Sequence, residues 1–425
     1  MKLNYKRTIL VGFAFFLICA FWQAYDTIVP LILTNKFGMD QTASGIIMAL
    51  DNIVAVFALP FFGNLSDKTR TRYGKRTPYI FFGTIVAALA LSALGFAGTL
   101  PLFIAFLLLA LISMATFRSP AVALMPDVTV KPLRSKGNAV INLMGTAGGI
   151  VILVLAMIFG TGAEGKTDFR AYLVSVSVVM LLALFVFLFT VREPAWSAEA
   201  EKAAATMADE EREERRASGG RLSRGQMASL LLILASVALW YIGYNSITSK
   251  YSLYATNILG VSYSLTLMIA QGAAVISYIP VGFLASRIGR KKSILAGVAL
   301  LTFSFAAGYF VEPGSSTLLM VVIFALAGIA WATINVNSFP MVVELAQGSD
   351  VGKYTGYYYT ASMAAQVITP IFSGALYDRF GMRNVFFPYA AIACGLAFFT
   401  MLFVRHGDAK PAPKAGLEAL DVDDD

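Results

Sequence analysis

Three ionisable residues lie inside apolar stretches, where charged side chains are rare and usually functional. Asp26 lies in the stretch WQAYDTIVP, Asp51 lies in MALDNIV, and Arg118 lies in a third apolar stretch. A carboxylate in such a place can take up a proton in one state and release it in another when its surroundings change. The pattern predicts Asp26 or Asp51 as the proton acceptor. Arg118 is a further candidate for coupling, and it needs a carboxylate, a ligand hydroxyl or carbonyl oxygens as a partner. A fixed ion pair or a hydrogen bond between helices would explain the same residues.

Polar and aromatic side chains recur at helical spacing in several other apolar stretches. Trp22 and Asp26 are four residues apart, as are Trp331 and Asn335, so each pair shares one face of a helix. Hydrogen-bonding side chains and aromatic rings together can bind a small polar molecule. The candidates for substrate binding are Trp22, Gln23, Tyr241, Tyr244, Asn245, Gln271, Trp331, Asn335, Tyr358 and Gln366. Each alone is more simply explained by hydrogen bonds between helices, but together they predict a polar cavity.

The composition of the chain indicates the class of protein that carries these residues. Of 425 residues 58% are hydrophobic and 14% are charged, with a mean hydropathy of +0.71. Soluble domains have about 25% charged residues. The chain therefore has too little polar surface for a soluble globule, and we expect an all-α membrane protein that lies in the lipid bilayer.

Twelve apolar segments are long enough to cross a membrane as helices. They are 8–34, 43–65, 77–98, 100–125, 137–160, 170–191, 226–250, 261–285, 293–311, 317–340, 352–376 and 385–405. The first segment is too long for the apolar part of a signal peptide, and no small-residue cleavage site follows it. We therefore predict an uncleaved first helix and twelve transmembrane helices.

The distribution of basic residues predicts the orientation of these helices. With the N-terminus inside, the inner segments hold 26 Lys and Arg and the outer segments hold 6. Cytoplasmic loops of membrane proteins are enriched in Lys and Arg, so both termini are expected in the cytoplasm. The same bias explains the net charge of +8, which makes a nucleic-acid partner an unnecessary assumption.

The densest basic cluster, GNLSDKTRTRYGKRTPYI at 63–80, follows the second predicted helix. Topology alone explains its charge, but the order of its residues is more specific than topology requires. Asp67 can accept hydrogen bonds from basic side chains or cap a helix N-terminus. We expect a cytoplasmic gate formed by Gly63, Asp67, Arg72, Gly74, Arg76, Asp127 and Arg134, in which Asp127 pairs with Arg134.

An internal repeat divides the chain. The stretch GFLASRIGRKK from Gly282 follows the eighth predicted helix as the basic cluster follows the second. We predict an N-terminal bundle of six helices (1–191), a cytoplasmic linker (192–225), a second bundle of six (226–405) and a disordered cytoplasmic tail (406–425). Two such halves with a site near the membrane midplane are the architecture of a secondary transporter.

Other classes of function lack support in the sequence. Cys19 and Cys394 both lie in apolar segments, and His406 is the single histidine of the chain. No phosphate-binding loop, nucleophile elbow or spacing of metal ligands is present. We therefore expect neither an enzyme nor a bound cofactor or metal.

The basic cluster and the stretch RSPAVALMPD, residues 118–127, carry a resemblance to a known family. The layout resembles the major facilitator superfamily. The motif GxLSDKTxxRYGKRxPYI is similar to that of the glycoside-pentoside-hexuronide:cation symporters, and more closely to their sucrose-carrier branch, solute carrier family forty-five. The resemblance implies a monomer in the cell (inner or plasma) membrane that imports a sugar or glycoside with a proton by alternating access.

The chain departs from this family at its ion-binding positions. The melibiose carriers have an Asp pair on the second helix, where this chain has Ala55 and Leu59, and an Asp on the fourth, where it has Arg118. The resemblance therefore implies that their sodium site is absent. The alternatives are an exporter or a carrier of lysolipids or other amphiphiles with the same fold, and a membrane sensor that does not transport.

Overall fold

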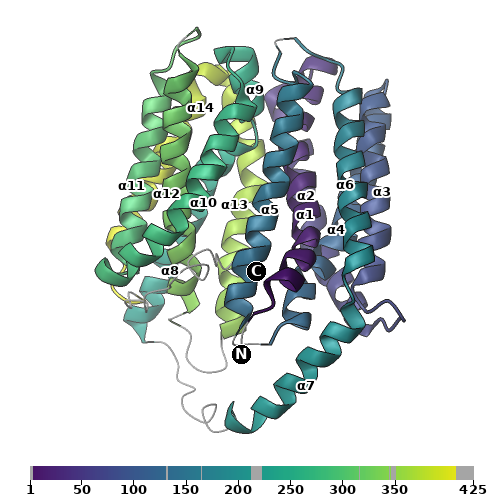
Figure 1. The fold of residues 1–425 in the computed structure, drawn as a ribbon. Coiled ribbons are helices and arrows are strands. Elements are labelled where there is room, and N and C mark those ends of the chain that lie inside the picture. The colour runs from purple at the N-terminus through teal and green to yellow at the C-terminus, as the bar shows by residue number, and fades with distance from the viewer. Residues whose placement is uncertain are drawn as a thin grey trace. The chain divides into compact units, whose positions relative to one another are not determined.

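The structure is a computed structural model that describes residues 3–130, 133–163, 165–211, 223–314, 316–343, 345 and 351–407. All regular secondary structure in these ranges is helical, as predicted (Figure 1). The predicted disordered tail lies outside the described residues from 408 onward, and so does the part 212–222 of the predicted linker.

The first six long helices follow the predicted segments, with ends that differ by no more than four residues. They are α1 (Tyr5–Leu31), α2 (Gln41–Lys68), α3 (Thr77–Phe96), α4 (Leu100–Val128), α5 (Arg134–Ile158) and α6 (Arg170–Thr190). A short π-helix, η1 (Ile32–Lys36), extends α1. Such segments are uncommon in helices and occur often at functional sites.

The second six long helices agree with the sequence equally well. They are α8 (Arg224–Thr248), α10 (Tyr263–Ile288), α11 (Arg290–Tyr309), α12 (Thr317–Val343), α13 (Val351–Phe380) and α14 (Met382–Leu402). Between α8 and α10 the chain forms α9 (Tyr251–Tyr254) and the π-helix η4 (Ala255–Leu259). Neither short element was predicted.

Eleven of the helices in the described residues are long and apolar enough to cross a membrane. The exception among the twelve is α13, which has 30 residues but contains the polar stretch YTGYYYTAS. Tyr358 and Gln366, two of the predicted substrate-binding candidates, both lie on α13. Large apolar side chains such as Phe57 (75% exposed) and Phe189 (74% exposed) are explained by contact with lipid.

The chain forms two compact units, which we call unit 1 and unit 2. Unit 1 contains residues 1–38 and 50–212, and unit 2 contains residues 39–49 and 213–424. Helix α2 is therefore divided, because its first residues belong to unit 2 and Leu50 onward belongs to unit 1. The predicted N-terminal bundle, 1–191, placed the whole of α2 in one half.

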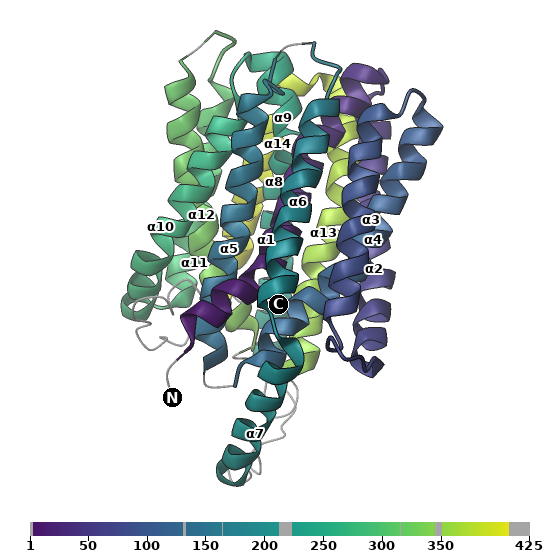
Figure 2. The same cartoon turned by 45° about the vertical axis from the view of Figure 1, so that its right-hand side comes forward.

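Helix α7 (Glu193–Glu211) occupies most of the predicted linker. It continues from the end of α6 and lies at the end of unit 1 where α2 leads into α3 (Figures 1 and 2). It packs against α4. The linker is thus helical in its first part and is attached to unit 1.

Candidate functional site

Three helices of unit 1 bring the predicted ionisable residues together. Asp26 on α1 and Asp51 on α2 are close enough for their charges to repel each other, and Arg118 on α4 attracts Asp51. All three residues are half-buried. One oxygen of Asp51 also accepts a hydrogen bond from the Nδ2 amide of Asn52 at 2.7 Å. The structure thus brings the three coupling candidates together, and their role in coupling stays a prediction.

Two aromatic residues of α1 line the same group. The guanidinium of Arg118 lies 5.5 Å from the centre of the Trp22 ring, a cation–π distance. Tyr25 is fully buried and interacts electrostatically with both aspartates. Sequence reasoning missed Tyr25, although its place beside Asp26 was a usable signal. We refer to Trp22, Tyr25, Asp26, Asp51 and Arg118 as the acidic cluster.

The acidic cluster contains one more acid than base. With both aspartates ionised, Asp26, Asp51 and Arg118 together carry one negative charge. Uncompensated charge within a membrane protein is costly, and one bound proton would neutralise it. The arrangement is therefore able to exchange a proton while Arg118 keeps the remaining carboxylate paired.

Unit 2 groups three of the predicted aromatic residues. The rings of Tyr244 on α8 and Trp331 on α12 are stacked, with centroids 3.6 Å apart and planes 6° apart. Tyr241, one turn before Tyr244, meets Trp331 edge-on at 5.3 Å. We refer to these residues and the adjacent Asn245 as the aromatic cluster. All four side chains of this cluster are half-buried.

Several buried side-chain polar atoms have no hydrogen-bond partner among the described residues. They include the indole nitrogen of Trp22 in unit 1 and the amide nitrogen of Asn245 in unit 2. Buried polar groups are nearly always paired, so an unpaired one calls for a water or a ligand. Trp22 and Asn245 are therefore candidates, each within its own unit, for hydrogen bonds to water or to a ligand.

The remaining substrate-binding candidates lie apart in sequence and differ in exposure. Gln23 on α1, Gln271 on α10 and Gln366 on α13 are half-buried, whereas Asn335 on α12 is 8% exposed. Tyr358 on α13 is buried and its hydroxyl lies 2.9 Å from that of Ser338 on α12. For Tyr358 the structure therefore shows a link between helices, which was the simpler of the two interpretations.

The basic cluster of unit 1 forms a network around one buried guanidinium. Arg76 is 4% exposed and donates to Asp127 at 2.8 Å, to Asp67 and to the Ser66 hydroxyl. Lys75 approaches the same Asp127 oxygen at 3.2 Å. A buried Arg with three acceptors fixes the ends of α2 and α4 against the start of α3.

One predicted pairing in this network is wrong. Arg134 donates to the backbone carbonyls of Pro126 and Thr129, at 2.9 and 3.1 Å, instead of pairing with Asp127. The reason is that Asp127 is already occupied by Arg76, while the end of α4 leaves carbonyl groups in need of donors. Arg72 stacks its guanidinium on its neighbour Tyr73 at 4.6 Å.

A carboxylate that the sequence analysis missed completes the network. Glu193, at the start of α7, is 1% exposed and accepts hydrogen bonds from the backbone N–H groups of Lys75, Arg76 and Thr77 at 2.7–2.8 Å. It thereby caps the N-terminus of α3 from a distant part of the chain. Glu193 lies more than 110 residues along the chain from the N–H groups that it binds, so no local sequence pattern indicates the contact.

Steric constraints explain why glycine occupies two positions of the predicted gate. Gly74 has a φ of +111°, and a Cβ there would lie 2.2 Å from the carboxyl carbon of Glu193. At Gly63 a Cβ would lie 2.7 Å from the Ser119 hydroxyl of α4. Only glycine permits both the backbone conformation at Gly74 and the approach of Glu193.

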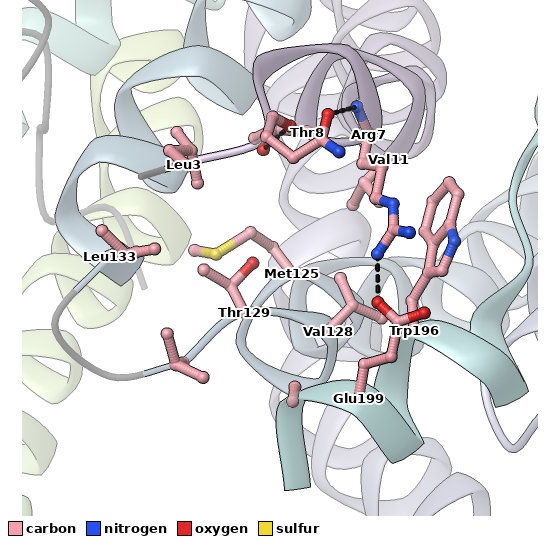
Figure 3. Close-up of a pocket in the computed structure, with 13 residues that line it drawn as sticks. Leu3, Arg7, Thr8, Val11, Met125, Val128, Thr129, Leu133, Trp196 and Glu199 are labelled. Carbon is pink, nitrogen blue, oxygen red and sulfur yellow. Dashed lines mark hydrogen bonds and ion pairs between the residues drawn. The ribbon is translucent and has the colours of Figure 1, made fainter. Parts of the chain in front are cut away.

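A cavity of about 220 Å³ lies in unit 1 between the start of α1, the end of α4 and α7 (Figure 3). Arg7 forms an ion pair with Glu199 across it and lies 5.2 Å from the ring of Trp196. Leu3, Met125 and Val128 contribute apolar walls (Figure 3). These contacts hold α7 to α1, and the cavity includes no residue of the acidic cluster.

No group of three or more His, Cys, Asp or Glu residues that could hold a metal ion occurs in the described ranges. His406 lies 3.0 Å from the hydroxyl of Ser229, where it joins the end of α14 to the start of α8.

Comparisons with known proteins agree with this arrangement. Residues 10–350 match the model of a family described as MFS/sugar transport protein. An MFS-type transporter, ppzB of Metarhizium rileyi, is 30% identical over 115 residues, which are 27% of this chain and 23% of that protein. The uncharacterized symporter YnaJ of Bacillus subtilis is 31% identical over 62 residues, which cover 15% and 13% of the two chains. The chain thus aligns with less than a quarter of the length of these relatives.

The fold itself is shared with a solved structure. The inward-open xylose transporter XylE from E. coli superimposes with a TM-score of 0.66 over 98% of this chain and 99% of XylE, at 12% identity. At this identity the likeness extends to the fold alone. It agrees with the predicted major facilitator fold.

Proposed function

The chain belongs to the MFS/sugar transport protein family, and from this premise we propose that it is a proton-coupled symporter of a sugar or glycoside that works by alternating access. Membership of the family makes it a multi-pass membrane transporter. The coupling ion, the substrate and the direction of transport are the parts that we propose. Within the family we place it with the glycoside-pentoside-hexuronide:cation symporters, on the motif at 63–80.

One observation carries the proposal of proton coupling, namely the excess of acid over base in the acidic cluster. Arg118 compensates for one of Asp26 and Asp51. The other carboxylate needs a proton whenever the site is closed to water, because charge is costly in a dry protein interior. A carrier that closes around this group therefore favours the protonated form and carries the proton with it.

Sodium coupling has weaker support in the same group. Sodium and similar hard cations prefer several oxygen ligands, and Arg118 already supplies a fixed positive charge next to Asp51. A second cation beside this guanidinium would be repelled. The presence of Arg118 therefore favours a proton, which neutralises an aspartate without occupying a ligand sphere.

The aromatic cluster supports a sugar as the substrate. Tyr244 and Trp331 present a rigid stacked pair, and aromatic side chains provide large contact areas for apolar faces of ligands. Asn245, in the same cluster, has an amide nitrogen that lacks a partner in the described residues. A hydroxyl oxygen of a glycoside would accept this hydrogen bond while its C–H face packs on a ring.

The experiment is transport by purified protein in liposomes. A panel of monosaccharides, disaccharides and glycosides is added outside at pH 6, with and without sodium, while a trapped pH indicator follows proton entry. The proposal expects one class of sugar to cause proton uptake that is independent of sodium. Uptake of sugar that requires sodium, or proton uptake that is caused by amphiphiles and by none of the sugars, would contradict it.

A matched variant separates coupling from folding in this assay. Asp168 is an exposed aspartate that pairs with Arg170 at 2.7 Å outside the membrane-spanning helices. Asp168→Asn changes the same functional group as Asp26→Asn but leaves the acidic cluster intact. We expect normal sugar-driven proton uptake in Asp168→Asn and none in Asp26→Asn.

A further inference from the structure

A lysine without solvent exposure lies where α8 ends, outside the groups considered so far. Lys250 is 0% exposed, which is rare for an amino group. Its Nζ atom donates to the backbone carbonyl and to the side-chain oxygen of Gln41, each at 2.9 Å. Gln41 is the first residue of α2 and belongs with Lys250 to unit 2.

The start of α2 is also held by a carboxylate from α13. Asp378 accepts hydrogen bonds from the backbone N–H groups of Gln41 at 2.8 Å and Thr42 at 2.7 Å, and from the Thr42 hydroxyl. It therefore caps the N-terminus of α2 from another helix. Lys250, Gln41, Thr42 and Asp378 are called the outer clasp, because the charge distribution places this end of α2 outside.

Two glycines allow the backbones to approach closely at the outer clasp. A Cβ on Gly45 of α2 would lie 2.0 Å from the carbonyl oxygen of Pro370 on α13. A Cβ on Gly374 of α13 would lie 2.3 Å from the carbonyl oxygen of Gln41. Neither position accepts a side chain while this contact is made, so residues 39–49 are packed directly on α13.

The contact of residues 39–49 with α13 affects how the halves of a carrier can move. Residues 39–49 pack with unit 2, whereas α2 from Leu50 onward belongs to unit 1. Alternating access moves the two halves of such carriers against each other. An outer contact that binds the beginning of α2 to unit 2 resists that movement and must be released to admit substrate from outside.

The number of acceptors around Lys250 indicates its protonation state in the closed clasp. The two acceptors from Gln41 match the two N–H bonds of a neutral amine. An ammonium group has three N–H bonds, and no third acceptor lies within hydrogen-bond distance among the described residues. The closed clasp is therefore suited to the neutral form, and burial of a charged amine would be costly.

We propose that the outer clasp opens in each transport cycle and that Lys250 binds a proton from the outer solution when it opens. In the closed clasp the amine donates its two N–H bonds to Gln41. On opening, the amine becomes solvated, and its lone pair takes up a proton from water to form the ammonium ion. Closing returns this proton to the outer solution.

The direction of the pH effect follows from the two states. Burial lowers the pKa of Lys250 from its ordinary value of 10.5 to about 7 in the closed clasp, and in the open state the solvated amine regains that ordinary value. Between about pH 7 and 10 the open state therefore binds one more proton than the closed state. Acidification across this range favours opening, by up to about tenfold in the equilibrium constant per pH unit.

The other ionisable groups near Lys250 are carboxylates, a guanidinium group and phenols. The neighbouring charged and phenolic groups, from the loop before α2 and from α9, α13 and α14, are Asp40, Tyr251, Tyr254, Tyr377, Asp378 and Arg383. Carboxylates and guanidinium groups keep their charge between pH 7 and 10. Burial raises the pKa of Tyr251 and Tyr254 above its usual range. A response centred between pH 7 and 10 is thus assigned to Lys250.

The test is a distance measurement by pulsed electron resonance. Ile46 on α2 is 49% exposed, and Ala375 on α13 is exposed, so spin labels on Ile46→Cys and Ala375→Cys report the outer clasp. Cys19 and Cys394 are first replaced by alanine. At pH 10 we expect mainly one short distance between the labels. At pH 7 we expect a second, longer distance, and the population ratio of long to short distance should be at least tenfold higher than at pH 10.

The variants make the result specific. In Lys250→Met the populations should no longer respond to pH, and in Lys36→Met, the matched outer lysine in unit 1, they should respond as in the original protein. Asp378→Asn removes one acceptor and keeps the amine, so it should increase the long distance at every pH and retain the pH response. Distances that are independent of pH in the original protein, or an equal pH response in Lys250→Met, would overturn the proposal. Because no substrate is needed, the result is independent of the proposed sugar transport.

Discussion

The acidic cluster of unit 1 and the aromatic cluster of unit 2 differ in the chemistry of their side chains. The first joins Asp26, Asp51 and Arg118 from three helices. The second joins uncharged rings, with Trp331 stacked on Tyr244. Carboxylates exchange protons with water, whereas indole and phenol groups keep their protons near neutral pH. This difference is the basis of our proposal that unit 1 handles the proton and that unit 2 provides an aromatic surface for the substrate.

The largest expected effect is the loss of coupling in unit 1. Asp51→Asn removes the negative charge that Arg118 attracts and leaves one carboxylate for one guanidinium, so the acidic cluster no longer requires a proton. We expect accumulation of sugar above the outside concentration to be lost, while the carrier still equilibrates sugar across the membrane. The measurement is radiolabelled uptake at an inward proton gradient. Accumulation as in Asp168→Asn would show that the acidic cluster is structural.

The aromatic cluster should respond in affinity instead of coupling. Trp331→Ala removes the stacked partner of Tyr244 and a large contact area, at a cost of about 1.5–3 kcal/mol, or roughly 10- to 100-fold in Kd. Trp331→Phe keeps an aromatic face and should lose less. Sugar affinity is measured by calorimetry. A change in the proton-to-sugar ratio with unchanged Kd would reverse the assignment of roles to the two units.

A smaller effect is expected on stability, where the two units differ in how the ends of their helices are held. In unit 1 the Glu193 carboxylate binds the N-terminus of α3 through several hydrogen bonds. In unit 2, at the corresponding helices, the Lys291 ammonium of α11 donates to the carbonyls of Leu402 and Val404 at 2.9 and 2.7 Å. Glu193→Gln keeps the size but removes the charge and one acceptor oxygen. We expect a loss of about 2 kcal/mol and a Tm lower by a few degrees.

Two variants complete this comparison. Glu201 is exposed on α7, so Glu201→Gln should leave the Tm unchanged. Lys291→Met should lower the Tm less than Glu193→Gln, because carbonyl groups near a helix end are partly accessible to water. Thermal unfolding in detergent measures all three. Equal Tm values for Glu193→Gln and Glu201→Gln would mean that the carboxylate cap does not stabilise unit 1.

The smallest effect concerns the pH dependence of stability at Lys250. Its pKa in the folded protein is lowered to about 7 from 10.5, so the unfolded chain binds more protons between these values. Stability should therefore rise with pH across this range in the original protein, relative to Lys250→Met. Tm values at pH 7, 8 and 9 for both proteins test this sign. The Tm of the original protein minus the Tm of Lys250→Met should increase with pH. A decrease of this difference with rising pH would contradict the prediction.

The sequence predicts much of the fold because its signals are local. Long apolar segments separated by charged turns define the twelve helices, and the excess of basic residues on one side defines their orientation. The proximity of Asp26 and Asp51 also follows, because two antiparallel neighbouring helices place residues of similar depth near each other. These features depend on composition and spacing, which a single sequence displays.

The partners of buried charged groups are not predictable in this way. Glu193 caps α3 from beyond α6, and Lys250 reaches Gln41 from the end of α8. Each depends on which helices pack together and on glycines that permit close approach. The error in pairing Asp127 with Arg134 has the same origin, because proximity in sequence was taken for proximity in space.

The central claim is that unit 1 carries the coupling proton at Asp26 and Asp51. The most direct test measures proton uptake and sugar exchange in liposomes containing the double variant Asp26→Asn, Asp51→Asn. The account predicts that sugar added outside no longer drives proton entry, while exchange of sugar across the membrane continues because the aromatic cluster is intact. Sugar-driven proton entry equal to that of the original protein would contradict it.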